Sequence, residues 1–313
     1  MNLVFILLLA VLQQPPQQAP QPPGGERLRW AFPTIEMVRP VAPEGPRTVP
    51  GSSKTYTGPQ IDDLNNPPDW HPDQHPPAPG PIVKGRGVVF ACGSCHLMSG
   101  LGHPESSDLT GFTAAYLMQQ MQDFKSGARK DAANRMGAIA QGLSDEETRQ
   151  VVDWFVSLKK RLWNRTVETN TVPKTYVGQG RMRFVLKDGG GTEPIGNRII
   201  TLPEDQLRAA SHDPNSGFVS NVPVGSVAKG KALVEGGGGK TVACAICHGD
   251  NLQGLANIPR LAGLHPVYLF RQLYIFKNGD RNGPEAPLMK KAVAQLTEED
   301  MVNISAYLGS LAP

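Results

Sequence analysis

The sequence has no long hydrophobic run, no marked excess of one charge and only a few cysteines. Its apolar run from Leu3 to Leu12 covers about half of the roughly twenty residues that a membrane-spanning helix needs. Lys and Arg number 31 against 28 Asp and Glu, a formal net charge of +3. That balance argues against a dedicated nucleic-acid-binding protein, which would carry a strongly basic patch. No cysteine lies near the apolar run, so a lipoprotein anchor is excluded there.

The amino-terminal run has the length of the hydrophobic core of a signal peptide. No Lys or Arg precedes it and no clear cleavage site follows, so an uncleaved anchor is the alternative. We interpret residues 1–23 as a signal peptide followed by a Gln- and Pro-rich tract. The protein is therefore expected to be exported, to the periplasm or to the outer face of the cytoplasmic membrane. Peripheral association with that membrane is one option.

Proline is concentrated near the amino terminus: of 29 prolines in 313 residues, most precede Lys84. Because proline fixes its own backbone and removes an N–H donor, regular structure is disfavoured there. Residues 24–83 nevertheless carry scattered large apolar side chains. We expect them to form an irregular strap that lies on a folded body, without a core of its own. These apolar residues are Trp30, Phe32, Ile35, Val38, Tyr56, Ile61 and Trp70.

An internal repeat organises the rest of the chain. When Cys92 is placed on Cys244, many identities follow in register, among them Arg129 on Arg281. So many matches at one offset indicate a duplication. The sequence therefore predicts two copies of one domain and a long connector between them. The first copy covers residues 84–160, the connector 161–225 and the second copy 226–313.

Each copy has the sequence signals of a small helical domain. Ser144 and Glu147 form a capping box before the last helix of the first copy, and Thr297 begins the corresponding helix of the second. Pro266 suits a first helical turn, and Gly279 suits the position just after a helix. We predict a mainly α protein with two tandem helical domains. Each copy is marginal in size for a stable core, so a bound cofactor would supply the missing apolar mass.

The connector carries two stretches with strand-like composition. Arg181–Leu186 and Asn197–Leu202 are rich in β-branched and other apolar residues, and a glycine-rich turn lies between them. This pattern favours a short β-hairpin within the connector.

All four cysteines belong to two copies of the motif Cys-x-x-Cys-His, which is the attachment signature of c-type haem. Positions i and i+3 share one face of a helical turn, so both thiols can bind one porphyrin edge while the histidine faces the iron. A thioredoxin-type pair would sit in a βαβ context, and a four-cysteine zinc site would leave both histidines unexplained. A structural disulfide is the third alternative. We predict two covalently bound haem c groups, at Cys92, Cys95 and His96 and at Cys244, Cys247 and His248.

The second iron ligand is predicted by comparing the copies. If the domains arose by duplication, both haems should have the same kind of ligand. Of the nine methionines, only Met136 and Met289 form a matched pair, after one residue is inserted in the alignment. Met118 and Met121 lie three apart on a helix, which is more typical of core packing. We therefore expect Met136 and Met289 to be the axial ligands, a set that raises the reduction potential relative to two histidines.

The remaining histidines have no haem-motif context. His71 and His75 lie four residues apart, but adjacent prolines prevent the helix that would align them on one metal ion. A solvated loop is the interpretation of that segment. His265 aligns with Thr113 and is expected to be a local or capping residue.

The two halves resemble class I cytochrome c domains, and together they resemble the dihaem cytochrome c4-type family. In that family a proline after the haem histidine offers its carbonyl group to the Nδ1–H of the ring. Pro259 matches that proline, and Ser107 takes its place in the first half. The second half carries the fuller pattern: Cys244 to His248, Pro259 to Gly263, Tyr268, Leu269, Gln272, Leu273, Phe276, Lys277 and Gly279.

The resemblance implies electron transfer, as a carrier or as the cytochrome subunit of an exported oxidoreductase, with redox proteins as partners. With both axial positions filled, neither iron needs to bind a substrate, so we do not expect an enzyme. The alternative is a dihaem enzyme of the thiosulfate dehydrogenase or peroxidase type. The former uses a cysteine as ligand of its catalytic haem, and no fifth cysteine exists. Lys290 and Lys291 are either solvated or steer an acidic partner.

Overall fold

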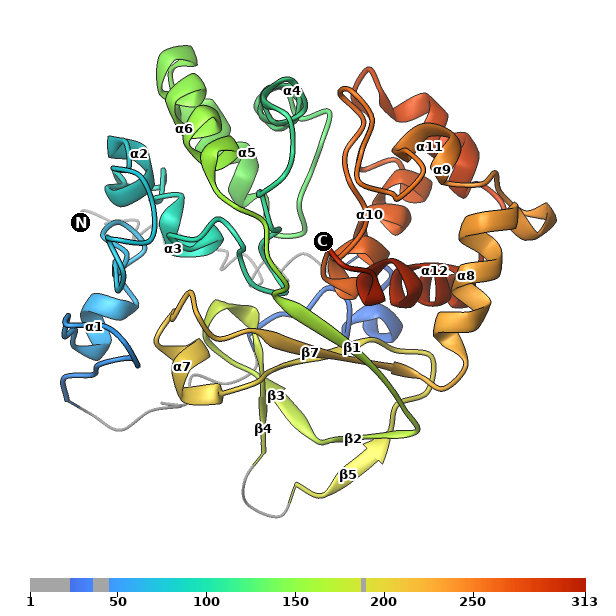
Figure 1. The fold of residues 1–313 in the computed structure, drawn as a ribbon, viewed down its shortest axis with the longest axis horizontal. Helices are drawn as coiled ribbons and strands as arrows, with labels where there is room; N and C mark the ends of the chain where they lie inside the picture. Colours follow the sequence, from blue (N-terminus) through green and yellow to red (C-terminus); the bar gives the residue numbers. More distant parts are fainter. Residues whose placement is uncertain (1–22, 36–44, 187–189) are drawn as a thin grey trace, which may run out of the picture.

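The computed structural model describes residues 23–35, 45–186 and 190–313. Two groups of helices lie side by side, and a layer of short strands from the connector lies beneath both (Figure 1). The expected mainly α architecture of two cytochrome c-like helical domains is confirmed. The first group contains α3 (Gly93–His96), α4 (Ala114–Ser126), α5 (Arg135–Gly142) and α6 (Asp145–Ser157). The second contains α8 (Ser226–Gly236), η3 (Gly237–Gly239), α9 (Ala245–His248), α10 (Pro266–Asn278), α11 (Ala286–Val293) and α12 (Glu298–Ser310).

The helix ends follow the local sequence signals. The Ser144 hydroxyl accepts the N–H of Glu147, whose carboxylate accepts the N–H of Ser144, and the same capping box begins α12 at Thr297. Pro266 occupies the first turn of α10, and Gly279 ends it with a φ of 88°. These ends were predicted correctly because they depend on short-range hydrogen bonds and on backbone preferences.

The two copies differ in their first helix. In the second copy α8 packs along α12, and a Cβ placed on Gly230 would lie 1.9 Å from the carbonyl oxygen of Asn303. Only glycine therefore allows the two helices to cross so closely. In the first copy the corresponding helix is the single turn α2 (Gly80–Val83), which ends the strap and contacts α3 and α6.

The strap packs on the body of the protein, as expected. The Trp30 ring lies 4.6 Å from that of Phe270 on α10, and the indole N–H of Trp70 donates to the carbonyl of Ser211 at 2.7 Å. The expectation that it has no core of its own was wrong. Val49, Ile61 and Trp70 form a small buried cluster with Tyr56, and Ile61 ends the single turn α1 (Gly58–Ile61). The 3₁₀ turn η1 (Glu26–Leu28) precedes this cluster in the chain, and its Leu28 packs in the main core. Val38 lies outside the described residues.

The connector contains more strand than expected, and its strands pair differently. Both predicted stretches are strands, but β4 pairs antiparallel with β3 and β6 pairs with β7, so they do not form the predicted hairpin with each other. Between β4 and β6 the chain forms another strand, β5, which pairs with β2. β7 also pairs in parallel with β1, giving the sheet order β1-β7-β6. The bounds are β1 (Asn164–Thr169), β2 (Thr171–Pro173), β3 (Thr175–Val177), η2 (Gln179–Arg181), β4 (Arg183–Val185), β5 (Thr192–Pro194), β6 (Ile200–Pro203), α7 (Gln206–Ala210) and β7 (Phe218–Pro223).

Within the described ranges, no helix combines the length and the apolar character needed to cross a lipid bilayer. The apolar run from Leu3 to Leu12 and the Gln- and Pro-rich tract up to residue 22 lie outside those ranges.

Candidate haem sites

Each Cys-x-x-Cys-His motif folds as one helical turn. Cys92 and Cys244 are the N-cap residues of α3 and α9, and the histidines end these helices. Within the described residues all four cysteines are free and partly exposed. The i and i+3 positions of one turn place the two thiols of each motif on the same face, as attachment to one haem edge requires.

The cysteines do not have the electrostatics of a redox-active pair. Burial raises the pKa of Cys92 to about 12 and that of Cys244 to about 11, and each neighbouring cysteine adds to the shift. A thioredoxin-type pair needs a thiolate, and therefore a lowered pKa. The structure thus argues against that alternative for both motifs.

The haem histidines are held in one orientation and one tautomer. Nδ1 of His96 lies 2.8 Å from the carbonyl oxygen of Ser107, and Nδ1 of His248 lies 2.7 Å from that of Pro259. Because a carbonyl only accepts, Nδ1 carries the proton and Nε2 keeps the lone pair that a metal ligand needs. Burial lowers the pKa of both rings, against the opposing effect of the carbonyl, and so favours the neutral form that binds a metal.

The turn after each histidine is the same in both copies. Leu97 has a φ of 58° and Gly249 a φ of 81°, so the chain enters the left-handed region directly after the ligand. The next contact is also shared, since Gly102 N donates to the carbonyl of His96 at 2.9 Å and Gly254 N donates to that of His248 at the same distance. The carbonyl partner of each ring follows within this loop.

The predicted axial methionines occupy equivalent places. Met136 is the second residue of α5 and Met289 lies in α11, and both side chains are partly buried. The Asp131 carboxylate accepts the N–H of Met136 at 2.9 Å and fixes the start of α5. Three other methionines are fully packed into hydrophobic cores and are 1% to 3% exposed. These are Met98, Met182 and Met301.

A symmetric polar contact joins the two copies. Arg129 donates to Gln120 of its own domain and to Gln272 of the other, each at 2.9 Å. Arg281 donates to Gln272 at 2.9 Å and, across the contact, to Gln120 at 2.7 Å and the Tyr116 hydroxyl at 3.0 Å. Both arginines are 7% exposed, and neither forms an ion pair within the described residues. The repeat identity of the two arginines was the sequence signal for this pair, but its role at the domain contact was missed.

One buried and one half-buried ion pair also cross between the domains. Arg260, which is fully buried, contacts the Asp108 carboxylate and donates to the carbonyl of Thr110 at 2.9 Å. Arg271 lies 2.9 Å from Glu105. Breaking a buried pair leaves an uncompensated charge, so these contacts fix how the two domains sit against each other.

A group of buried and half-buried histidines was missed by the sequence analysis. His103 from the first copy and His265 from the second are buried, His212 from the connector is half-buried, and burial lowers the pKa of each. His265 stands at the N-cap position of α10 but makes no capping hydrogen bond, which corrects the expectation of a capping role. His71 is also buried, 3.8 Å from the Asp213 carboxylate, whereas the residues from Pro72 to Gln74 are exposed, so only part of this segment is the expected solvated loop.

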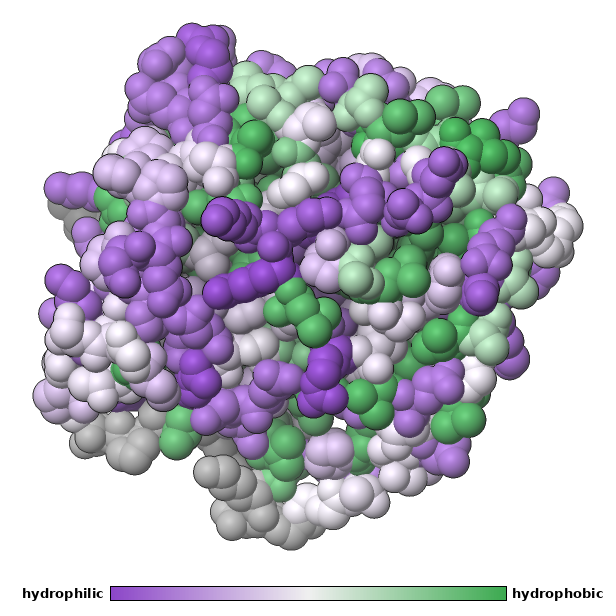
Figure 2. Space-filling view, viewed as in Figure 1, coloured by the Kyte–Doolittle hydropathy of each residue, from purple (hydrophilic) through white to green (hydrophobic). Residues whose placement is uncertain are grey.

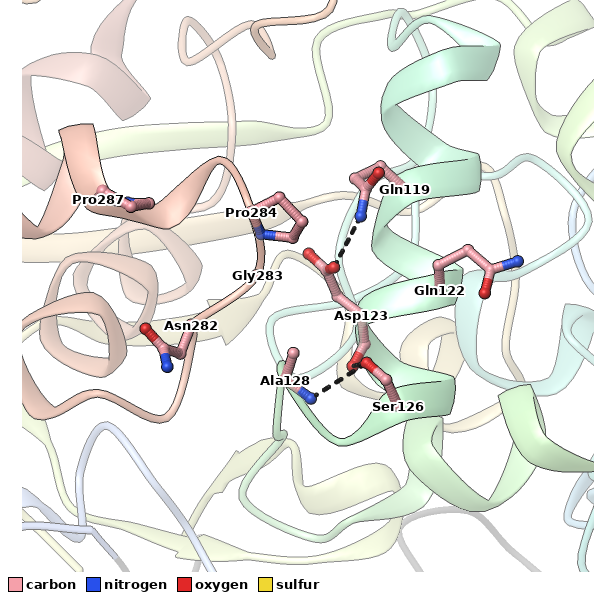
Figure 3. A pocket seen from close by; sticks show the side chains of 9 residues that line it. All are labelled: Gln119, Gln122, Asp123, Ser126, Ala128, Asn282, Gly283, Pro284 and Pro287. Carbon is pink, nitrogen blue, oxygen red and sulfur yellow. Dashed lines mark hydrogen bonds between the residues drawn. The ribbon is translucent and has the colours of Figure 1, made fainter.

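An open groove of about 550 Å³ lies between α4 and the loop before α11 (Figure 3). Five of its nine lining residues have polar side chains, and Gln119 donates to the Asp123 carboxylate at 2.8 Å. None of the predicted haem-binding residues lines this groove. It is a feature of the contact between the domains and not one of the haem sites.

The repeated site geometry agrees with the comparison to known families. A family model described as Cytochrome c matches residues 82–159 and, a second time, residues 227–312. The chain belongs to the cytochrome c family. It is a dihaem c-type cytochrome that transfers electrons, with one haem c attached to each Cys-x-x-Cys-His motif.

Similar proteins include a cytochrome c4 and a thiosulfate dehydrogenase electron acceptor. Cytochrome c4 of Stutzerimonas stutzeri is 26% identical over 240 residues, which cover 75% of this chain and 90% of the relative. The thiosulfate dehydrogenase electron acceptor of Stutzerimonas stutzeri (strain A1501) is 35% identical over 227 residues, covering 72% and 80%. The crystal structure of reduced cytochrome c4 from Pseudomonas stutzeri aligns with a TM-score of 0.46 at 23% identity, covering 70% of this chain and 93% of that one. The resemblance predicted from the motifs is confirmed.

Proposed function

We propose that this cytochrome is an exported carrier whose two haem irons are each bound by one histidine and one methionine. His96 and Met136 would hold the first iron, and His248 and Met289 the second. The observation that carries the proposal is the twofold occurrence of one arrangement: a buried histidine with Nδ1 hydrogen-bonded to a carbonyl, and a methionine in the next-but-one helix. The haem domains would be residues 84–160 and 226–313.

The haem supplies the electron-transfer chemistry, because its iron alternates between the ferrous and ferric states. The protein's own residues hold it and set its environment. The carbonyls of Ser107 and Pro259 orient the two imidazoles, and a thioether ligand raises the potential above that of a bis-histidine haem. With both axial positions filled and all four cysteines used for attachment, no residue is left to provide the cysteine ligand of a thiosulfate dehydrogenase-like haem. These features support a carrier over an enzyme.

The haem content is tested by intact mass and by haem staining after denaturing electrophoresis. We expect two haem additions per chain, and one addition, in the second domain, when Cys92→Ala is combined with Cys95→Ala. The mass also reports whether residues 1–23 have been removed, which tests export with cleavage against an uncleaved anchor. A wild-type mass with fewer than two additions would contradict the proposal.

The relative named thiosulfate dehydrogenase electron acceptor favours an exported dehydrogenase of sulfur compounds as the electron donor. The test mixes the oxidised cytochrome with a thiosulfate dehydrogenase and thiosulfate and records the haem spectrum. Reduction of both haems is expected. If dithionite reduces the cytochrome and the enzyme does not, this donor is wrong while the carrier function stands.

A further inference from the structure

Large apolar side chains are exposed around the second haem motif. Val242 is 54% exposed, Ile246 69%, Leu255 56% and Leu288 70%, and we call these four residues the apolar face. Ile246 directly precedes Cys247, and Leu288 directly precedes Met289. Figure 2 shows apolar surface gathered where α9 and α11 lie, while the surface over α6 is mainly hydrophilic.

The apolar face lies on the two chain segments that carry the predicted haem-binding residues of the second domain. Val242 lies two residues before Cys244, and Leu255 follows the turn after His248. A Cβ placed on Gly249 would lie 4.0 Å from that of Leu255, so this side chain stands directly beside the haem turn. A soluble protein seldom exposes several large apolar side chains together unless they form a contact surface.

The first domain has no matching face: Phe90, in place of Val242, is only partly exposed, although Val88, four residues before Cys92, is 71% exposed. At the aligned positions it carries Ser94 in place of Ile246, His103 in place of Leu255 and Arg135 in place of Leu288. Ser94 and His103 are 4% and 8% exposed, and Arg135 lies over the ring of Phe90.

The strap and the connector cover the first motif. Pro67 and Ile82 of the strap pack against α3, where a Cβ on Gly93 would lie 3.3 Å from Pro67 Cγ and 2.9 Å from the Ile82 carbonyl oxygen. On the connector side, the indole N–H of Trp163 donates to the carbonyl of Gly102 at 3.0 Å. The duplicated domains therefore differ in how far their haem-binding segments are open to another protein.

The charges around the apolar face balance. Lys290 and Lys291 follow Met289, while Asp250 and Glu285 lie on the same two segments of chain. None of these four side chains forms an ion pair with any residue that the structure describes. Two positive and two negative groups give this surface no net charge, so a strongly acidic or basic partner would gain little from it.

We propose that the apolar face is the docking surface through which the second haem exchanges electrons with a redox protein whose own surface is apolar and weakly charged. The first haem, covered by the strap and the connector, then exchanges electrons chiefly through the second. This inference rests on the proposed carrier function. It assigns different tasks to two domains that share one set of haem-binding residues.

The test measures electron self-exchange between oxidised and reduced copies by NMR line broadening. A second copy is a suitable probe because it presents the same apolar, charge-balanced surface. Ile246→Asp combined with Leu288→Asp should lower the bimolecular rate constant about tenfold or more, since docked faces would bury carboxylates. Ile246→Ser combined with Leu288→Ser should lower it by a smaller factor. The wild-type constant should depend only weakly on salt.

The matched control places the same two charges elsewhere, in Val88→Asp with Leu162→Asp, at residues 71% and 62% exposed. It should leave the constant within about twofold of wild type.

An unchanged constant in the Ile246/Leu288 aspartate variant, or an equal fall in the control, overturns the proposal. So does a wild-type dimer that this variant dissociates in sedimentation, or wild-type binding to phospholipid vesicles that it abolishes. Reduction by the small complex hexaammineruthenium(II) separates the docking proposal from the carrier function. If this reductant cannot reduce the haems, the carrier function itself is wrong.

Discussion

At the residue scale, the hydrogen bonds of the two haem histidines show which part of the local sequence orients the imidazole ring. Nδ1 of His96 bonds to a serine carbonyl and Nδ1 of His248 to a proline carbonyl at nearly the same distance. The acceptor is thus the backbone, and the proline ring only restricts φ. A motif that requires proline here would miss the first site, although its hydrogen bond is equivalent.

The methionine ligands are tested at the same scale. A ferric haem with a thioether ligand has a weak far-red charge-transfer band, which is absent with two nitrogen ligands. We expect this band at the intensity of two sites. Met136→His should remove about half of it and lower one potential, and Met289→His should do the same for the other haem. Met121→Leu, which nearly conserves volume, should leave the band intact. A wild-type band at half intensity would mean that one haem lacks methionine.

His265 makes stability depend on pH. Burial, and then the charge of Arg271, lower its pKa to about 3, and neither ring nitrogen has a hydrogen-bond partner within the described residues. In the unfolded chain the ring takes up a proton below about pH 6.5. As the pH falls from there toward 3, the unfolded state binds a proton that the folded state does not, so stability is lost.

His265→Phe removes this proton uptake and keeps an aromatic ring beside Phe218, which lies 5.4 Å away between centroids. Between pH 6 and 4, the free energy of unfolding should fall less steeply in the variant, by up to about 1.4 kcal/mol per pH unit. Urea unfolding followed by circular dichroism measures both slopes. Equal slopes in the two proteins would show that His265 is protonated while the protein is folded.

The sequence predicted the residues that act through local spacing and missed those that act through tertiary contact. The attachment residues form a fixed motif, while the prediction that Met136 and Met289 are iron ligands rests on the repeat and is tested by the variants above. His103, His212 and His265 come from three segments of the chain, and no local pattern marks a residue that becomes buried or half-buried only when those segments meet.

At the element scale, local signals predicted the helices, whereas the pairing of the strands depends on tertiary contacts. The helix ends were predictable because capping boxes and terminal glycines are local. The strand pairing was not predictable, since β7 pairs with β1, which lies far away in sequence. The two predicted strands also pair with other strands and not with each other: β4 with β3, and β6 with β7. Local composition identifies a strand, while its partner depends on the whole connector.

The attachment of the strap is tested with Trp30→Ala. The Trp30 ring is 7% exposed and packs on Phe270, so its truncation should cost about 3 kcal/mol or more at this contact. Trypsin cleavage after Arg27 and Arg29 should therefore be at least about tenfold faster, with both haems retained. Ile35→Ala is the control, because Ile35 is 49% exposed. Equal cleavage rates in Trp30→Ala and wild type would show that another contact holds the strap.

At the scale of the whole molecule, two copies of one domain form a single unit, joined by a polar contact and by a hydrophobic core that includes residues of both copies. The arginine pair, with its glutamine and tyrosine acceptors, places two buried positive charges between the haem domains. Buried cations without carboxylate partners in the described structure fit a site that lies beside an anionic group, and haem carries carboxylates. The duplication was predictable from the sequence, but the contact was not, since each arginine reaches into the other copy.

Arg281→Gln tests how this contact acts on the haems. The positive charge of Arg281 helps to lower the pKa of His248, behind burial, so it is felt at the second haem ligand. A nearby positive charge disfavours ferric iron, which carries one more positive charge than ferrous iron, so removing it should lower the second haem's potential. A tenfold change in the equilibrium corresponds to about 59 mV for one electron, and we expect a fall of up to about that size. Spectroelectrochemical titration resolves the two potentials, and Arg129→Gln is the matched variant in the other domain. If Arg281→Gln leaves both potentials unchanged while small-angle scattering shows the domains still together, the arginine acts only as a contact between domains.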